Sequence, residues 1–163
     1  MNTMLTLGID PGTASTGYGL ITEKNGKLVF VDYGVIYTST TESSQGRLRI
    51  IYNELKRLIK DYKPQIVAIE KVFFGKNVKT AISVGAARGM TLLAAAEGKI
   101  QVAEYTPLEV KIAITGYGRA DKKQIQAMVK QLLGLSFLPK PDDAADALAI
   151  AICHQHSCKL TSL

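Results

Sequence analysis

Four acidic residues stand at positions where their carboxylates could hold divalent metal ions. Asp10 ends an apolar run near the start of the chain, and Glu70 ends a second one. Asp143 and Asp146 are three residues apart in a segment of helical composition, so both can lie on one face of a helix. Converging carboxylates repel one another and lose hydration, so such a cluster is stable only when protons or cations neutralise it.

The absence of His and Cys from this set favours Mg²⁺ or Mn²⁺, which prefer oxygen ligands. Two such ions held close together activate a water on one side of a phosphodiester and stabilise the leaving oxygen on the other. The acids therefore predict metal-dependent hydrolysis of a nucleic-acid backbone. The spacing alone does not choose between Asp142 and Asp143, because Asp142 is four residues before Asp146 and could instead cap the helix.

Each acid taken alone also fits a structural role. Asp10 precedes Pro-Gly and could be a turn residue, and Glu70 could mark the point where a strand reaches the surface. The combination of two strand-ending acids and two helical acids in a basic protein favours a catalytic metal site over these structural roles.

Apolar runs separated by turn-forming residues predict the elements that position these acids. Asn25-Gly26 indicates a tight hairpin turn, and Asp121 is a candidate N-cap. Strands are expected over 4–9, 18–22, 28–37, 65–69 and 101–105. Helices are expected over 42–60, 77–97 and 121–133, with a helical turn or two over 107–114 and a last helix that begins at Pro141 and Asp142. This order predicts one α/β domain over 1–163, in which helices flank a mixed sheet.

The helix expected over 77–97 is apolar nearly all the way round. One face of a sheet cannot cover such a helix, so a further surface must bury the remainder.

Charge and composition narrow the class of protein. Lys plus Arg is 20 against 14 for Asp plus Glu, a net charge of +6, and the cations extend from Lys24 to Lys159. A folded basic face of this kind suits a polyanion such as nucleic acid. The chain has no apolar run of roughly 18 to 20 residues and no signal-peptide pattern at its start, so we expect a cytoplasmic protein with no membrane span.

Five segments, in this order and at this spacing, resemble the RuvC family of crossover junction endonucleases, the Holliday junction resolvases with an RNase H-like fold. They are LGIDPGTASTGYG, VAIEKVFFGKN, GAARGM, EVKIAITGYGRADKKQIQ and DDAADALAIAICH. The resemblance extends from Leu7 to about His156. It implies an RNase H-like mixed five-stranded sheet flanked by helices.

The resemblance also implies the site residues. The family's four metal ligands match Asp10, Glu70, Asp143 and Asp146. The match therefore selects Asp143 over Asp142. Two lysines of the family's active site match Lys111 and Lys122, where positive charge would hold the scissile phosphate or stabilise its developing charge. From spacing alone, both would be solvated lysines on a helix face.

Further residues are expected to contact DNA. The family's aromatic residue that stacks on unpaired bases at the crossover matches Phe73, and Phe74 could share or take that role. A basic face would grip phosphates without reading sequence. With Asn77 beside it, this face draws on Lys76, Lys79, Arg88, Arg119, Lys122 and Lys123.

The chain departs from the family at Lys71, where glutamine is usual, and in the doubled basic pair Lys122-Lys123. Gly12, Gly17 and Gly19 are expected to let the chain turn back into the second strand, and Thr13, Ser15 or Thr16 to touch a phosphate.

The implied reaction is the symmetric cutting of two strands of like polarity in a four-way DNA junction, which leaves 5′-phosphate and 3′-hydroxyl nicks. Mg²⁺ is the implied cofactor, with two ions per site, and Mn²⁺ is a possible substitute. Two symmetric cuts require a homodimer. Part of the 77–97 helix, including Ala86, Met90 or Leu93, is the expected interface. RuvA and RuvB, the branch-migration proteins, are the implied partners.

Other functions remain open on the sequence. An acid followed by spaced glycines also occurs in actin-like or sugar-kinase ATPases, although those need two lobes. An RNase H-like nuclease acting on RNA or on RNA–DNA hybrids would use the same fold and metals. A binding module could keep the basic face without catalysis. A zinc site would need Cys153, His154, His156 and Cys158, but these do not share one helix face.

Overall fold

The computed structural model describes residues 3–71 and 77–161, with the backbone alone at 160 and 161. Within these residues a five-stranded mixed sheet runs in the order β3-β2-β1-β4-β5. The strands are β1 (Thr6–Asp10), β2 (Ser15–Lys24), β3 (Lys27–Tyr37), β4 (Ile66–Glu70) and β5 (Gln101–Tyr105). Neighbours β1, β2 and β3 pair antiparallel, whereas β4 runs parallel to β1 and to β5. Because β1 and β4 are parallel neighbours, their final residues Asp10 and Glu70 emerge at the same edge of the sheet.

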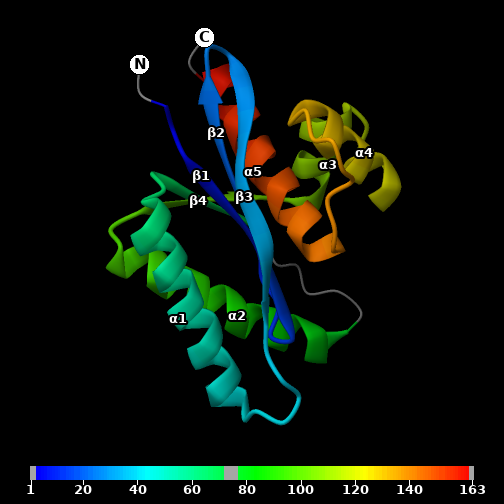
Figure 1. The fold of residues 1–163 in the computed structure, drawn as a ribbon. Helices are drawn as coiled ribbons and strands as arrows, with labels where there is room; N and C mark the ends of the chain where they lie inside the picture. Colours follow the sequence, from blue (N-terminus) through cyan, green and yellow to red (C-terminus); the bar gives the residue numbers. More distant parts are fainter. Residues whose placement is uncertain (1–2, 72–76, 162–163) are drawn as a thin grey trace.

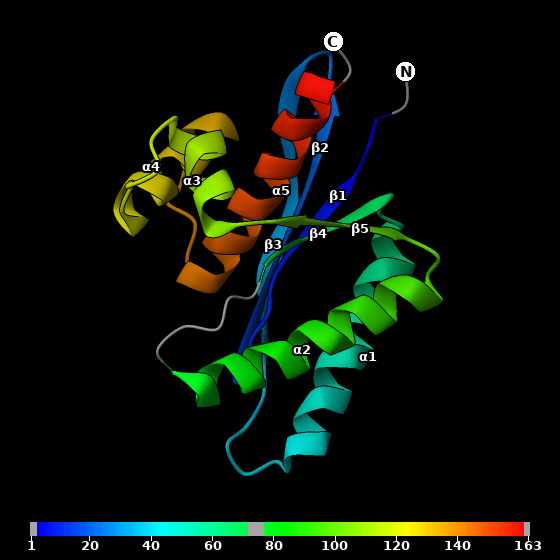
Figure 2. The same cartoon turned by 180° about the vertical axis from the view of Figure 1, so that it is seen from behind.

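Helices cover both faces of this sheet (Figure 1, and from behind in Figure 2). Helices α1 (Ser44–Tyr62) and α2 (Val78–Glu97) cover one face, and α5 (Asp142–Thr161) lies along the other, with α3 (Pro107–Thr115) and α4 (Lys122–Leu132) outside it. Val67 and Ile69 belong to the core under α1 and α2, while Ala68 belongs to the core under α5. The continuous apolar run in β4 therefore reflects burial on both sides.

Local signals place several element boundaries as the sequence predicts. Asn25 and Gly26 have φ of 51° and 77° and form the two-residue turn between Lys24 and Lys27, which pair with each other. Asp121 caps α4 by accepting a hydrogen bond from the backbone N–H of Gln124 at 2.8 Å. The segment expected to form a helical turn or two is the nine-residue helix α3, which starts with a capping box at Thr106.

The glycines of β2 have a different role from the one expected. Gly17 and Gly19 lie inside β2, opposite Asp10 and Gly8 of β1, so they form no turn. A Cβ on Gly17 would lie 2.0 Å from the carbonyl oxygen of Asp143, and one on Gly8 would lie 2.1 Å from that of Ala147. These glycines allow the backbone of α5 to lie directly on the sheet. The first turn of α5 therefore passes over the end of β1.

None of the helices in the described ranges is long and apolar enough to cross a membrane.

Candidate active site

Three of the predicted acids meet where α5 crosses the end of β1. Asp10 is the last residue of β1, and Asp143 and Asp146 lie in the first turns of α5. A ligand oxygen from each lies within 4.8 Å of the other two. In the part of the chain that the structure describes, no other three or more His, Cys, Asp or Glu residues are so arranged.

The electrostatics of this acid cluster show that it cannot carry its full charge unaided. The pKa of Asp10 is raised from 3.8 to about 8, chiefly by burial and then by charge repulsion from Asp146, Asp143 and Glu70, while Lys122 acts in the opposite direction. Burial also raises the pKa of Asp146. Without a cation, Asp10 therefore keeps a proton near neutral pH. A divalent ion on oxygen ligands would replace that proton, so the donor set fits Mg²⁺.

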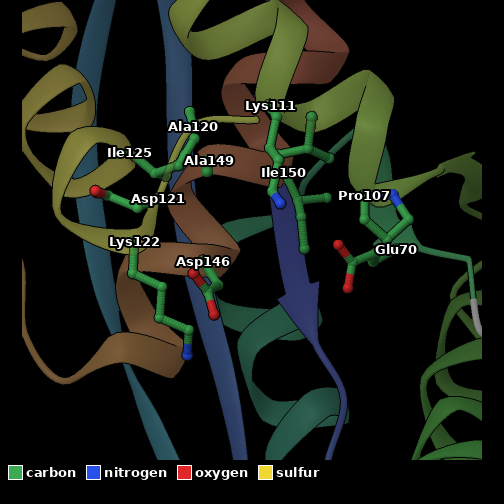
Figure 3. Close-up of a pocket in the computed structure, with 11 residues that line it drawn as sticks. Glu70, Pro107, Lys111, Ala120, Asp121, Lys122, Ile125, Asp146, Ala149 and Ile150 are labelled. Carbon is green, nitrogen blue, oxygen red and sulfur yellow. The ribbon is translucent and has the colours of Figure 1, made fainter. Parts of the chain in front are cut away.

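Glu70 lies beside these three acids without joining their group. It ends β4 and lines a cavity of about 340 Å³ together with Asp146, Lys111 and Lys122. Figure 3 shows the carboxylates of Glu70 and Asp146 on opposite sides of the end of a strand, both turned toward the same opening. Burial, followed by repulsion from Asp146, raises the pKa of Glu70, and Lys111 opposes this rise. The fourth predicted acid is thus coupled by charge repulsion to both Asp146 and Asp10 of the cluster.

Asp142 points to a different part of the molecule. Its Oδ1 accepts a hydrogen bond from Gln126 Nε2 at 2.8 Å, and its Oδ2 lies 3.7 Å from Lys122 Nζ, so it faces α4. It is also the first residue of α5 and not its cap. Of the two residues between which spacing does not choose, Asp143 is the one whose carboxylate lies in the acid cluster.

Lys111 and Lys122 approach the acids from α3 and the start of α4. Both line the cavity, Lys111 on the side of Glu70 and Lys122 on the side of Asp146 (Figure 3). Lys122 lowers the pKa of Asp10 and of Asp146, so its charge acts on both. A phosphate that entered the cavity would meet positive charge at two walls.

Comparison with known proteins shows which family the chain belongs to. The family model described as Crossover junction endodeoxyribonuclease RuvC matches residues 6–154. The chain belongs to the RuvC family. The resemblance predicted from the five segments is thereby confirmed.

Individual RuvC proteins match almost from end to end. The crossover junction endodeoxyribonuclease RuvC of Desulfitobacterium hafniense is 58% identical over 157 residues, which are 96% of this chain and 95% of the relative. That of Syntrophomonas wolfei is 55% identical over 159 residues, covering 98% and 92%. The structure of Thermus thermophilus RuvC in complex with a Holliday junction substrate superposes with a TM-score of 0.92 at 35% identity, covering 98% of this chain and 97% of that one. The RNase H-like mixed sheet is that of RuvC.

The residues expected to contact DNA divide into three groups. Phe73, Phe74 and Lys76 lie outside the described residues. Asn77 caps α2 by accepting from the N–H of Thr80, and Arg88 forms an ion pair with Glu104 of β5, so both have structural partners. The remaining cations are exposed: Lys79, Arg119, Lys122 and Lys123.

The hydroxyl residues after Asp10 do not behave alike. Thr16 is fully buried, and its hydroxyl donates to the carbonyl of Gly12 at 2.6 Å. It therefore cannot reach a phosphate, contrary to the expectation from sequence. Thr13 Oγ1 lies 2.5 Å from Ser83 Oγ of α2. Ser15 donates to Oδ2 of Asp143 at 2.5 Å, a contact that sequence reasoning missed because the two residues are 128 positions apart.

A second cavity opens beside this turn, and no motif in the sequence predicts it. It has a volume of about 350 Å³ and lies between the first turns of α1 and α2. Its polar lining consists of Thr13, Ser44, Arg47, Lys79 and Ser83. Two cations and three hydroxyl groups without an acid make this cavity suitable for an anion.

Proposed function

We propose that this chain resolves Holliday junctions by metal-dependent, symmetric hydrolysis of two DNA strands of like polarity. The observation that carries the proposal is the convergence of Asp10, Asp143 and Asp146 beside Glu70. The chain has this arrangement on a fold that superposes on a RuvC bound to a Holliday junction. It would act as one nuclease domain on DNA in the cytoplasm.

The acids supply the metal ligands. Asp10, Asp143 and Asp146 would hold one Mg²⁺ ion, and Glu70 with Asp146 would help to hold a second. Ions bound there supply an activated water and neutralise charge on the leaving oxygen, and Mn²⁺ would substitute. The rise in the pKa of Asp10 supports this role. Burial and charge repulsion destabilise the ionised carboxylate, and a cation bound in place of the proton would remove that destabilisation.

The lysines position the scissile phosphate. Lys111 and Lys122 stand at opposite walls of the cavity, so a phosphodiester between them would be held by both and directed at the acids. Their charge would stabilise the negative charge that grows on the phosphate oxygens in the transition state. The products are a 5′-phosphate and a 3′-hydroxyl.

A homodimer would supply the two active sites that symmetric cutting needs. The exposed side of α2 carries Val78, Ile82 and Leu93, with 61%, 66% and 45% of their surface exposed. Gly85 and Gly89 lie between them, and a Cβ on either would meet no atom within 4 Å, so another helix could approach closely. Met90, one of the expected contacts, is partly buried and packs against the core under α1 and α2, so it offers less exposed surface to a partner. We therefore place the interface on Val78, Ile82 and Leu93.

The DNA backbone would run over both cavities. The turn after β1 leads from Asp10 in the acid cluster to Thr13, which lines the cavity at Arg47 and Lys79, and this cavity and the one at the acids both present cations. Phosphate contacts along this path would fix the register of the junction, and Phe73 or Phe74 would contact bases at the crossover. RuvA and RuvB are the proposed partners in branch migration.

The decisive experiment compares substrates and metals. Purified protein is incubated with a synthetic four-way junction, a linear DNA duplex and an RNA–DNA hybrid, each with Mg²⁺ or with EDTA. We expect symmetric cuts in the junction alone and only with Mg²⁺. Asp10→Asn should bind the junction without cutting it. Cleavage of the hybrid but not of the junction would support the RNase H-like alternative, and cutting in EDTA would refute the metal mechanism.

A further inference from the structure

Ser15 joins the sheet to the acid cluster through one hydrogen bond. It is the first residue of β2, and its Oγ donates to Oδ2 of Asp143 at 2.5 Å. The backbone of α5 passes Gly17 of the same strand so closely that Asp143 is held directly over the start of β2. Ser15 therefore contacts the one acid of the cluster that stands in the first turn of a helix.

The chain around Ser15 is fixed from several sides. Thr16 Oγ1 donates to Gly12 O at 2.6 Å and closes the turn before Ser15. Thr38 holds the same turn from the end of β3, because its Oγ1 donates to Thr13 O at 2.5 Å and its N–H to Ala14 O at 3.1 Å. Ser15 itself pairs with Tyr37 in the sheet. Its hydroxyl is thus presented from a braced position.

The hydroxyl of Ser15 counteracts the charge repulsion within the acid cluster. Three carboxylates whose oxygens lie within 4.8 Å repel one another, and an unrestrained Asp143 would lower its energy by rotating away. Ser15 opposes that rotation with a neutral donor, so it fixes the carboxylate without cancelling the negative charge that attracts a cation. Groups that orient a metal ligand in this way change metal affinity without touching the metal.

We propose that Ser15 is a positioning residue, which holds the Asp143 carboxylate in place for divalent metal binding. This inference rests on the proposed function, in which Asp143 is a metal ligand.

The test measures metal binding in the absence of DNA, by calorimetry or by the electron paramagnetic resonance of free Mn²⁺. Ser15→Ala removes the donor, and Ser15→Thr restores a hydroxyl with a side chain that suits a strand. Thr22→Val is the matched control, because Thr22 lies in the same strand and donates to Met4 O far from the acids. We expect the Mn²⁺ dissociation constant to rise about 10-fold in Ser15→Ala and to return toward wild type in Ser15→Thr. Junction cleavage by Ser15→Ala should recover at high Mg²⁺, since only metal occupancy is impaired.

The variant Asp143→Asn distinguishes a failure of the proposed metal site from a failure of the proposed role of Ser15. If Asp143→Asn binds Mn²⁺ as well as the wild type does, the proposed metal site is wrong. If Asp143→Asn loses Mn²⁺ while Ser15→Ala keeps wild-type affinity, the metal site stands and the role of Ser15 is refuted. Equal weakening in Ser15→Ala and Ser15→Thr would also refute it, because the hydroxyl would then not be the cause.

Discussion

Replacing Asp10 with asparagine should stabilise the metal-free protein while it abolishes cleavage. The pKa of Asp10 is raised to about 8 by burial and by the neighbouring acids, so its ionised form destabilises the folded state. Asparagine keeps the shape of the side chain and removes the charge. The same substitution thus separates the stability of the site from its chemistry.

The size of the effect follows from the pKa. A rise from 3.8 to about 8 corresponds to about 6 kcal/mol at about 1.4 kcal/mol per pH unit. Water at the partly exposed carboxylate reduces this cost, so we expect about 2 to 3 kcal/mol. The sign is fixed because the unfolded carboxyl loses its proton near pH 4, whereas the folded one keeps it until about pH 8. Between these values the folded state binds more protons, so wild-type stability falls as pH rises.

Urea unfolding in EDTA from pH 4 to pH 9 measures this difference. The advantage of Asp10→Asn should be near zero at pH 4 and reach its maximum at pH 8 and above. Mg²⁺ should then stabilise the wild type more than the variant, because only the wild type keeps the full ligand set. Asp142→Asn is the matched control, since that acid faces Gln126 and Lys122, and it should show no such gain. A wild type as stable as Asp10→Asn at pH 8 without metal would contradict the electrostatic account of the site.

Three further predictions concern packing, assembly and DNA contact. Gly17→Ala should push away the first turn of α5, lower the free energy of unfolding by about 1 to 3 kcal/mol and abolish junction cleavage; wild-type cleavage would show that α5 tolerates the shift. Ile82→Lys should give monomers in sedimentation that bind metal but do not resolve junctions. Leu108→Lys, on α3 and 55% exposed against 66% for Ile82, should stay dimeric. Replacing Arg47 and Lys79 together with alanine should weaken junction binding and reduce the slope of log affinity against log salt by about 1 for each lost phosphate contact; an unchanged slope would exclude that cavity from the DNA path.

The predictable part of this fold is the part that local patterns determine. The apolar runs before Asp10 and Glu70 form strands in the middle of the sheet, because only a central strand needs to be apolar on both faces. The runs alone do not determine that these two strands are parallel neighbours. Asn25-Gly26 formed the hairpin turn, because both residues accept the positive φ that it requires. These signals operate within a few residues, so they can be recognised without knowing what packs against them.

The rest depended on contacts between distant segments. Gly17 was expected to serve a turn, and its actual role is to leave room for a carbonyl group of α5, far along the chain. The choice between Asp142 and Asp143 depends on which side of α5 faces the sheet, because consecutive residues on a helix point about 100° apart. Spacing gives both residues a plausible link to Asp146. Only the position of α5 on the sheet decides between them.

The position of the acids at the start of α5 also shows why a cation is needed. Asp142 and Asp143 stand in the first turn of this helix, where the helix dipole stabilises each negative charge by about 0.3 to 1 kcal/mol. That is well below the cost that raises the pKa of Asp10 to about 8. Lys122 opposes the rise and does not abolish it. Neither the helix nor the nearby lysine therefore balances the converging carboxylates, and the charge that remains is what would draw a divalent ion to this end of the sheet.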